Sequence, residues 1–223
     1  FCGRAVSAGD KIHPGDMFFA IPNQPGQLLA NDISKYNLFT AREKMEKNAP
    51  VMKSAADCKN IRPQILEAMR SVCEILKAGG VRLGDKLGFE LSHHYGLDEF
   101  RRWGCAIINC VNREYCKKII VLLPGQENPS HSHKLKEETF HVLYGKVSLV
   151  LNGEKKDYKA GDMIVVERGV AHSFSSREGA VFEEISTTHH KDDSFYDDEE
   201  ITRNPDRKTS MIFRTSWLTD GVA

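Results

Sequence analysis

One spacing of histidine, glutamate and glycine residues constrains this chain more than any other feature: Gly125-x5-His131-x-His133-x4-Glu138-x6-Gly145. His131 and His133 are two residues apart, so on an extended chain both side chains project to the same side. Glu138 opens the next run of strand-forming residues, which can pair with the first strand and bring its carboxylate to the same point. A second spacing, Gly161-x5-Glu167-x-Gly169-x2-His172, supplies a third imidazole from another hairpin.

These four side chains form a donor set suited to a metal ion. Three neutral imidazoles and one carboxylate suit Fe, Mn, Ni, Co, Zn or Cu. Four protein ligands leave open positions on a six-coordinate ion, which allows a Lewis acid or an oxygen-binding site. We therefore predict one divalent transition metal ion, of a kind the sequence leaves open, bound by His131, His133, Glu138 and His172.

The alternative is a metal-free site in which these histidines only form hydrogen bonds inside the protein. Such a reading would suit an isolated His-x-His, but here all four ligand positions are filled. We interpret the other histidines after residue 85 as surface or hydrogen-bonded residues rather than ligands: His93, His94, His141, His189 and His190.

From Leu87 onward the chain is a series of short, β-rich runs with turn residues between them. Asn152-Gly153 predicts a tight hairpin, because both residues tolerate the positive φ that such turns need. Residues 97–103 interrupt the series, and we expect one or two helical turns that end at Gly104. Many short strands with regular turns are typical of a sandwich or barrel. The expected strands are 118–123, 139–144, 146–151, 163–166, 171–175 and 181–186.

The two histidine-containing spacings resemble the two sequence motifs of the cupin superfamily. The first motif fits completely, and the second departs at Glu167, where the family usually has proline, and at Ser176, where it often has asparagine. Neither position is a ligand. The resemblance implies a mainly β fold, a double-stranded β-helix or jelly-roll barrel, with the metal ion inside it.

The residues before 85 have a different character. Residues 1–52 are rich in Gly and Pro, which favours short, kinked strands, although Thr40-Ala41-Arg42-Glu43 matches a capping box and predicts a short helix up to Asn48. A stripe at three- and four-residue spacing predicts a helix with one packing face between 53 and 80: Ile65, Met69, Val72, Cys73 and Leu76. We therefore expect a β-rich module (1–52), a helical linker (53–84) and a barrel domain (85–223).

Two stretches of the first module, 15–22 and 25–32, resemble the antifreeze-like (SAF) domain at the C-terminus of sialic acid synthases. Segments 91–96, 113–118 and 183–188 are similar to a synthase subgroup in which a cupin follows the SAF module. The resemblance implies a role in sialic acid or nonulosonate biosynthesis. It also implies a synthase TIM barrel as partner within a longer polypeptide, because the chain opens on Phe1 and such a barrel needs about 250 residues of its own.

A metal ion alone does not make an enzyme, because a positioned acid or base is also needed. Glu183 and Glu184 are adjacent in an expected strand, so one of them should point into the barrel. We expect burial to raise the pKa of that carboxyl and let it shuttle protons; the alternative is a pairing with a lysine or arginine in the barrel. Lys118 is a further catalytic candidate, because it and Lys117 lie on opposite faces of their strand.

The charge balance gives no reason to expect nucleic acid or an anionic membrane as partner, because the chain has 31 Lys and Arg residues and 31 Asp and Glu residues. No apolar run approaches the ~20 residues of a membrane-spanning helix. The six cysteines contain no CxxC pair, so we interpret them as mostly buried free thiols and expect a cytoplasmic protein. Cupins and sialic acid synthases are commonly dimeric, and the resemblance therefore implies a homodimer.

Three classes of function remain open. In the first, the metal ion chelates neighbouring oxygens of a sugar or sugar acid, and a glutamate moves a proton in isomerisation or epimerisation. In the second, the barrel is a non-catalytic module that binds a sugar or holds a dimer together. In the third, the ligand set serves a metal-dependent dioxygenase. An acid inside the barrel favours the first class, an aliphatic lining favours the second, and oxygen consumption with iron would identify the third.

Overall fold

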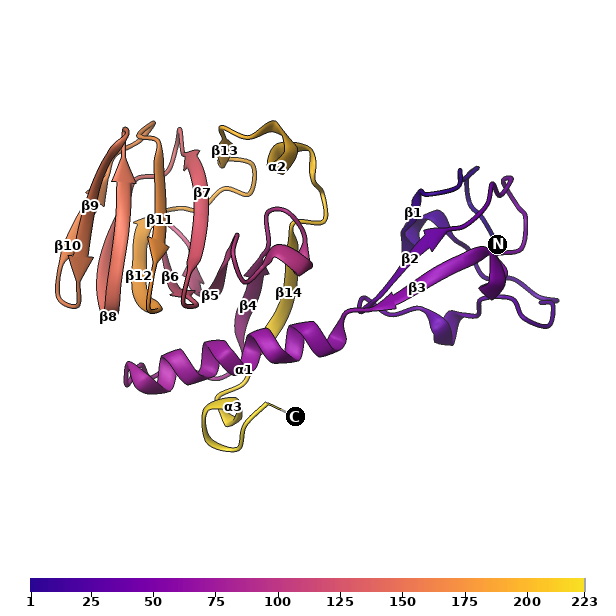
Figure 1. Cartoon of the computed structure of the whole chain (residues 1–223), viewed down its shortest axis with the longest axis horizontal. Coiled ribbons are helices and arrows are strands. Elements are labelled where there is room, and N and C mark those ends of the chain that lie inside the picture. Colours follow the sequence, from indigo (N-terminus) through magenta and orange to yellow (C-terminus); the bar gives the residue numbers. More distant parts are fainter. Residues whose placement is uncertain (223) are drawn as a thin grey trace. The chain divides into compact units, whose positions relative to one another are not determined.

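The computed structural model describes residues 1–222 and divides into two compact units, of which the first is Phe1–Leu66 and the second begins at Glu67. The first unit contains a three-stranded antiparallel sheet in the order β1-β2-β3 (Figure 1). Its strands are β1 (Lys11–Ile12), β2 (Asn37–Ala41) and β3 (Ala56–Asn60). Three single turns of 3-10 helix accompany them, at Pro14–Asp16, Ala30–Asp32 and Lys53–Ala55.

The helix predicted between Thr40 and Asn48 is wrong. Thr40 lies in β2, opposite Lys11 of β1 and Asp57 of β3, and the following residues form bends and turns. Pairing on both sides of β2 satisfies its backbone groups, which outweighs the local capping-box pattern. Because β3 belongs to this sheet, the first unit extends beyond residue 52, where the sequence pattern placed its end.

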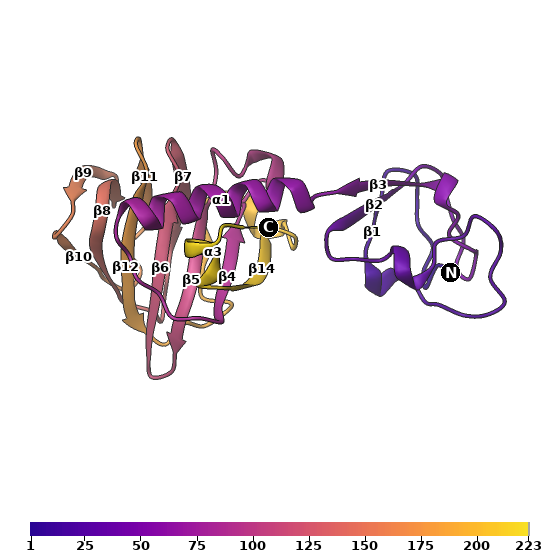
Figure 2. The ribbon, with the colours of Figure 1, turned by 90° about the horizontal axis from the view of Figure 1, so that it is seen from below.

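The helix α1 (Arg62–Ala78) starts later than the predicted linker but contains the whole predicted apolar stripe. All five stripe residues are buried. Within the second unit the helix crosses the outer face of the large sheet, as Figure 2 shows. Contacts are close there: a Cβ on Gly79 would come 2.8 Å from Tyr144, and one on Gly179 would come 2.8 Å from Ile75. The stripe is therefore a packing face.

The second unit is built on an 11-stranded antiparallel sheet that curls on itself. Its main path is β13-β7-β11-β8-β12-β6-β5-β4-β14, and β9 and β10 both pair with β8. The strands in chain order are β4 (Leu87–Ser92), β5 (Cys105–Asn112), β6 (Tyr115–Leu122), β7 (Gln126–Ser132), β8 (Glu138–Leu151), β9 (Glu154–Lys159), β10 (Met163–Val166), β11 (His172–Ser176), β12 (Ala180–Thr187), β13 (Phe195–Tyr196) and β14 (Lys208–Phe213). A 3-10 turn at Leu97–Glu99 and the short helices α2 (Glu199–Arg203) and α3 (Ser216–Thr219) complete it.

Strand β8 bends at Gly145 and so serves two layers. Its first half pairs with β10 and β12, and its second half pairs with β9 and β11. Gly145 has φ 76°, and a Cβ there would lie 2.3 Å from the carbonyl oxygen of Gly179. Only glycine fits this close approach. The sequence predicted two strands here, and the structure joins them into one bent strand.

The predicted hairpin at Asn152-Gly153 is confirmed, with φ 49° and 87° at the two residues between β8 and β9. The mainly β, jelly-roll fold class is confirmed as well. Among residues 1–222, none of the helices is both long and apolar enough to pass through a membrane. All six cysteines are free thiols; four are buried, Cys110 is half-buried and Cys58 is exposed.

Candidate metal centre

The predicted metal-binding residues come from three strands that meet inside the curled sheet. His131 lies in β7, directly opposite His172, the first residue of β11. His133 follows the end of β7, and Glu138 is the first residue of β8. One nitrogen from each of the three imidazoles lies within 4.8 Å of the other two, and all three rings are buried. The two-residue spacing of His131 and His133 thus brings both rings into one cluster.

Backbone carbonyls fix the outer nitrogen of each ring. Nδ1 of His131 lies 3.0 Å from the carbonyl oxygen of Pro129, and Nδ1 of His172 lies 3.0 Å from that of Val170. Nδ1 of His133 contacts the carbonyl oxygen of Asp193. A carbonyl only accepts, so each Nδ1 carries the proton and each Nε2 presents a lone pair. Metal-bound histidines are usually held in this way.

Burial keeps the rings of His131 and His133 neutral. It lowers the pKa of His131 well below its usual value, and the neighbouring His172 lowers it further. Burial also lowers the pKa of His133, although the charge of Glu138 opposes the shift. Neutral imidazole is the form that binds a metal ion.

Glu138 faces this cluster with one carboxylate oxygen that has no hydrogen-bond partner. Its Oε2 lies 3.2 Å from Nε2 of His172, and neither atom has a hydrogen-bond partner. Its Oε1 lies 3.7 Å from Nε2 of His133. Nδ1 of His172 is held by a carbonyl, so its Nε2 and Oε2 of Glu138 face each other as unpartnered buried polar atoms, and a cation between them would satisfy both. The residues present therefore fit a metal ion, and the identity of the ion stays open.

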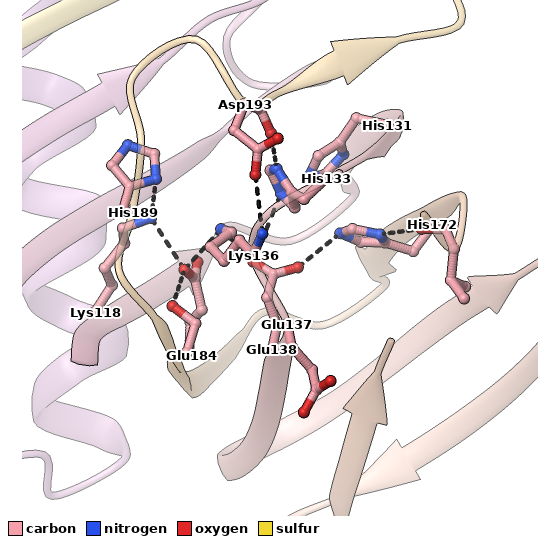
Figure 3. A network of polar contacts seen from close by, with 12 residues as sticks. Lys118, His131, His133, Lys136, Glu137, Glu138, His172, Glu184, His189 and Asp193 are labelled. Carbon is pink, nitrogen blue, oxygen red and sulfur yellow. Dashed lines mark hydrogen bonds and ion pairs between the residues drawn. The ribbon is translucent and has the colours of Figure 1, made fainter. Parts of the chain in front are cut away.

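Lys136 is a charged member of the site that the sequence pattern did not indicate. Its ammonium is buried and contacts Glu138, and it lies 3.0 Å from Oε1 of Glu184 (Figure 3). Burial lowers the pKa of Lys136, but Glu184 and Glu138 outweigh it, so the net pKa is raised. For the carboxyl of Glu138, burial acts in the opposite direction and raises the pKa. The contact of Glu138 with His172 and the charge of Lys136 outweigh burial and hold this pKa well below its usual value. Lys136 therefore links the metal cluster to Glu184.

Of the two candidate glutamates, Glu184 points into the barrel. It pairs across β12 and β6 with Lys118, whose ammonium lies 3.0 Å from its Oε1. The predicted rise in its pKa is wrong. Burial does raise the pKa of Glu184, but the charges of Lys118 and Lys136 outweigh burial and the net pKa is lowered. The pairing with lysine that the sequence left as an alternative is what the structure shows, and the carboxyl is ionised.

Glu183 lies on the opposite, outer face of β12. It pairs with Lys117 at 2.7 Å and with Nδ1 of His141 at 3.4 Å. Successive residues of a strand face opposite sides, so the structure separates the three catalytic candidates. Glu184 and Lys118 line the same cavity as His131, His133 and Glu138, and Glu183 is outside it.

Comparison with known proteins places this geometry in a recognised fold. Residues 118–186 match the family model described as Cupin domain. This match agrees with the cupin jelly-roll fold of the second unit. The chain also resembles two curated relatives, both 28% identical. The first is the D-lyxose/D-mannose isomerase of Thermosediminibacter oceani, over 174 residues, 64% of this chain and 96% of the relative. The second is the D-lyxose ketol-isomerase of a Thermofilum species, over 141 residues, 50% of this chain and 78% of the relative.

Two solved structures agree at the level of fold. The L-ribose isomerase of Geodermatophilus obscurus superimposes with a TM-score of 0.54, at 16% identity, over 63% of this chain and 94% of that one. The L-ribose isomerase of Cellulomonas parahominis with L-psicose gives 0.53 at 16% identity, over 64% and 94%. The likeness to the SAF module and to sialic acid synthases stays a prediction from the sequence.

The other histidines of the cupin domain behave largely as predicted. His93 and His94 are buried and hydrogen-bonded, the first 2.9 Å from Thr209 and the second 2.9 Å from Asn128. His190 is exposed. His189 is more closely involved than expected, because its Nδ1 lies 3.4 Å from Nζ of Lys118 and it lines the cavity. Burial lowers its pKa to about 4, so this ring is neutral.

The cavity around the site is small and has an aromatic floor. Phe140, Phe174 and Phe182 contact one another with ring centroids 5.1–6.0 Å apart, and Phe140 also contacts His172. The cavity volume is about 60 Å³. An apolar floor excludes water and strengthens the electrostatic interactions among the charged groups above it.

A segment after β12, residues 188–196, covers the cavity, and we call it the strap. Figure 3 shows it passing His189, which lies next to Lys118, and reaching Asp193 beside His133. Tyr196 at its end stacks on the ring of His131, with centroids 5.3 Å apart. Sequence reasoning assigned no role to Asp193 or Tyr196.

Proposed function

We propose that the cupin domain is a metal-dependent sugar isomerase that moves a proton between neighbouring carbons of a sugar. One observation carries this proposal: an ionised, enclosed carboxylate, Glu184, lines the same cavity as His131 and His133. A positioned base beside a metal site is the arrangement that proton transfer next to a carbonyl requires. The similarity to ketose-forming isomerases of D-lyxose and D-mannose supports the same reaction class.

His131, His133, Glu138 and His172 are the residues that would hold the metal ion. A bound divalent ion supplies a Lewis acid, which polarises sugar oxygens and acidifies the C–H bond beside the carbonyl. The fixed Nδ1 contacts keep the rings ready for this role, and the aromatic floor keeps bulk water away from it.

Glu184 would act as the base. Its lowered pKa keeps it ionised at neutral pH, so it can take the proton from C2 of an aldose. Return of this proton to C1, with transfer of one hydroxyl proton from O2 to O1, completes a ketose. Return of the proton to the opposite face of C2 gives the epimer instead. Lys118 and Lys136 orient the carboxylate and can donate hydrogen bonds to a sugar oxygen.

The biological setting in this proposal comes from the sequence resemblance of residues 1–52 to a SAF module. It places the chain in sialic acid or nonulosonate biosynthesis, as part of a synthase-like polypeptide and as a homodimer. An N-acetylmannosamine-type sugar then joins the candidate substrates. Its acetamido group leaves no hydroxyl at C2, so for that sugar we propose epimerisation rather than ketose formation.

The test is a substrate panel with defined metal content. Metal-free protein is reconstituted separately with Mn, Co, Ni, Zn or Fe and incubated in D2O with D-lyxose, D-mannose, L-ribose or N-acetylmannosamine. NMR should show a ketose or a C2 epimer, with deuterium at the carbon that exchanged its proton. No turnover with any metal would contradict the isomerase. Sugar binding without turnover would then indicate a binding module, and oxygen uptake by the iron form would indicate a dioxygenase.

A further inference from the structure

The strap is fastened at both ends to different parts of the barrel. At its start, the backbone N–H of His189 donates to Oδ1 of Asn112 at 2.9 Å, and Nδ2 of Asn112 donates to the carbonyl oxygen of His189 at 3.0 Å. At its other end, β13 pairs with β7, with Tyr196 opposite His131. The strap therefore runs from the end of β5 to β7, the strand that carries His131.

The middle of the strap is held by one side chain. Asp193 is 5% exposed, and its carboxylate accepts hydrogen bonds from three successive backbone N–H groups. Lys134 donates at 2.9 Å, Leu135 at 3.0 and 3.1 Å, and Lys136 at 3.0 Å. Three donors on one carboxylate make a strong, charge-assisted attachment.

This attachment fixes two functional groups at once. The three N–H groups belong to the turn between His133 and Glu138, so the carboxylate of Asp193 sets the backbone from which Lys136 projects. The carbonyl of the same residue holds Nδ1 of His133, and thereby directs Nε2 of that ring to the metal cluster. Side chain and backbone of Asp193 therefore act on the same turn.

The closed strap leaves too little space for a sugar. The cavity volume of about 60 Å³ is far below the roughly 300–1,000 Å³ of typical small-molecule pockets. A pentose, with five carbon and five oxygen atoms, needs a larger space than that. His189, Ser194 and Tyr196 of the strap line the cavity, so displacement of the strap enlarges it directly.

We propose that the strap, residues 188–196, is a lid that opens to admit the substrate, and that Asp193 is its latch and a positioning residue for His133 and Lys136. The opening rests on the proposed sugar-isomerase function, whereas the latch concerns the metal site alone. In the closed form the latch completes the orientation of the cluster, and in the open form the turn that carries Lys136 is released.

The first experiment compares Asp193→Asn with Asp192→Asn in the full chain. Both variants remove one negative charge, but Asp192 is exposed. The amide that replaces the carboxylate of Asp193 presents its own N–H groups to backbone donors, so the attachment weakens. Titration with Co²⁺ should show about 10-fold or greater loss of affinity for Asp193→Asn, the size typical of lost outer-shell support, and less than twofold change for Asp192→Asn. Equal Co²⁺ affinity in both variants would overturn the latch.

A second measurement uses the unaltered chain and stays decisive if Asp193→Asn fails to fold. Hydrogen exchange is followed with and without Co²⁺. Metal binding should slow exchange in peptides covering 188–194 and 134–136 together, because both segments share the Asp193 contacts. Exchange in the strap that does not respond to Co²⁺ would overturn the coupling.

Steady-state kinetics test the positioning role of Asp193 separately from the proposed isomerase activity. If the unaltered chain converts a sugar, Asp193→Asn at saturating metal should lower kcat with a smaller change in KM, since the turn carrying Lys136 is misplaced after the substrate has bound. Unchanged kcat and KM at saturating metal would overturn the positioning role. If the chain converts no sugar but the Co²⁺ and exchange results hold, the latch stands and the isomerase fails.

Discussion

At the scale of single residues, the site depends on which face of a strand each charged side chain occupies. Glu183 and Glu184 are neighbours in sequence, yet one pairs with Lys117 outside the sheet and the other with Lys118 inside it. Their chemistry differs because only the inner carboxylate is enclosed with the histidine cluster. A buried ion pair is not in itself evidence of stability, so the inner arrangement is better explained by function.

Replacement of Glu184 by Gln tests its role as base. The amide cannot accept a proton from carbon, so kcat for the sugar should fall by about 10²- to 10⁴-fold. Metal content should stay near that of the unaltered chain, because Glu184 is not a ligand. Glu183→Gln is the matched control and should keep kcat within twofold. Equal losses of kcat in the two variants would contradict the assignment of Glu184.

His94 gives a prediction for stability against pH. Burial lowers its pKa to about 4, although the hydrogen bond with Asn128 opposes this shift. The unfolded chain, with a histidine pKa near ~6.5, binds the proton at higher pH, so folding becomes less favourable as the pH falls from ~6.5 to ~4.

In the metal-free protein, the part of this loss due to His94 is about 3 kcal/mol of unfolding free energy. Urea denaturation at pH values across this range gives the unfolding free energy at each pH. Its total fall should be smaller by that amount in His94→Gln. His190 is exposed, and His190→Gln should leave the fall as it is. Identical falls in His94→Gln and the unaltered chain would refute the buried, neutral His94.

At the scale of elements, the bend in β8 brings the two halves of the barrel together. Glu138 and Phe140 lie in the half that pairs with β12, and the half beyond Gly145 pairs with β11, which begins at His172. A straight strand would separate Glu138 from His172. The geometry of the metal cluster thus depends on one glycine that is not part of it.

Gly145→Ala should destabilise the second unit far more than Gly153→Ala. Both positions have positive φ, but an added Cβ at Gly153 meets nothing within 4 Å, whereas at Gly145 it meets backbone at 2.3 Å. Backbone strain alone costs about 1–2 kcal/mol, and the clash should add about 1–3 kcal/mol. The free energy of unfolding from urea titration measures the difference. Similar losses in the two variants would mean that the approach to Gly179 is not tight.

The sequence predicted the elements whose signals are local. The ligand spacing, the Asn152-Gly153 turn and the stripe of α1 each involve residues close in the chain. The helix near Thr40 failed because β1 and β3, distant in sequence, pair with that segment. Lys136 and Asp193 were missed for a related reason. Lys136 pairs with Glu184, which is 48 residues away, and Asp193 holds a turn that is 57–60 residues away. The direction of the Glu184 pKa shift failed because burial alone was considered, without its two lysines.

At the scale of the whole molecule, metal binding should stabilise only the second unit. The cluster lies entirely within that unit, as do both tryptophans, Trp103 and Trp217. Metal at 100 times its dissociation constant should raise the unfolding free energy by about 2.7 kcal/mol. Tryptophan fluorescence during urea titration reports this change. The double variant His131→Ala/His172→Ala should show no stabilisation, and an equal response in it would place the ion elsewhere.

Elemental analysis of the purified chain tests the central claim most directly. The chain and the His131→Ala/His172→Ala variant are both reconstituted under reducing conditions with excess metal, desalted and measured. We predict about one divalent transition metal ion per chain in the unaltered protein and almost none in the variant. Absence of metal from the unaltered protein, or the same content in both, would contradict the metal centre and with it the isomerase.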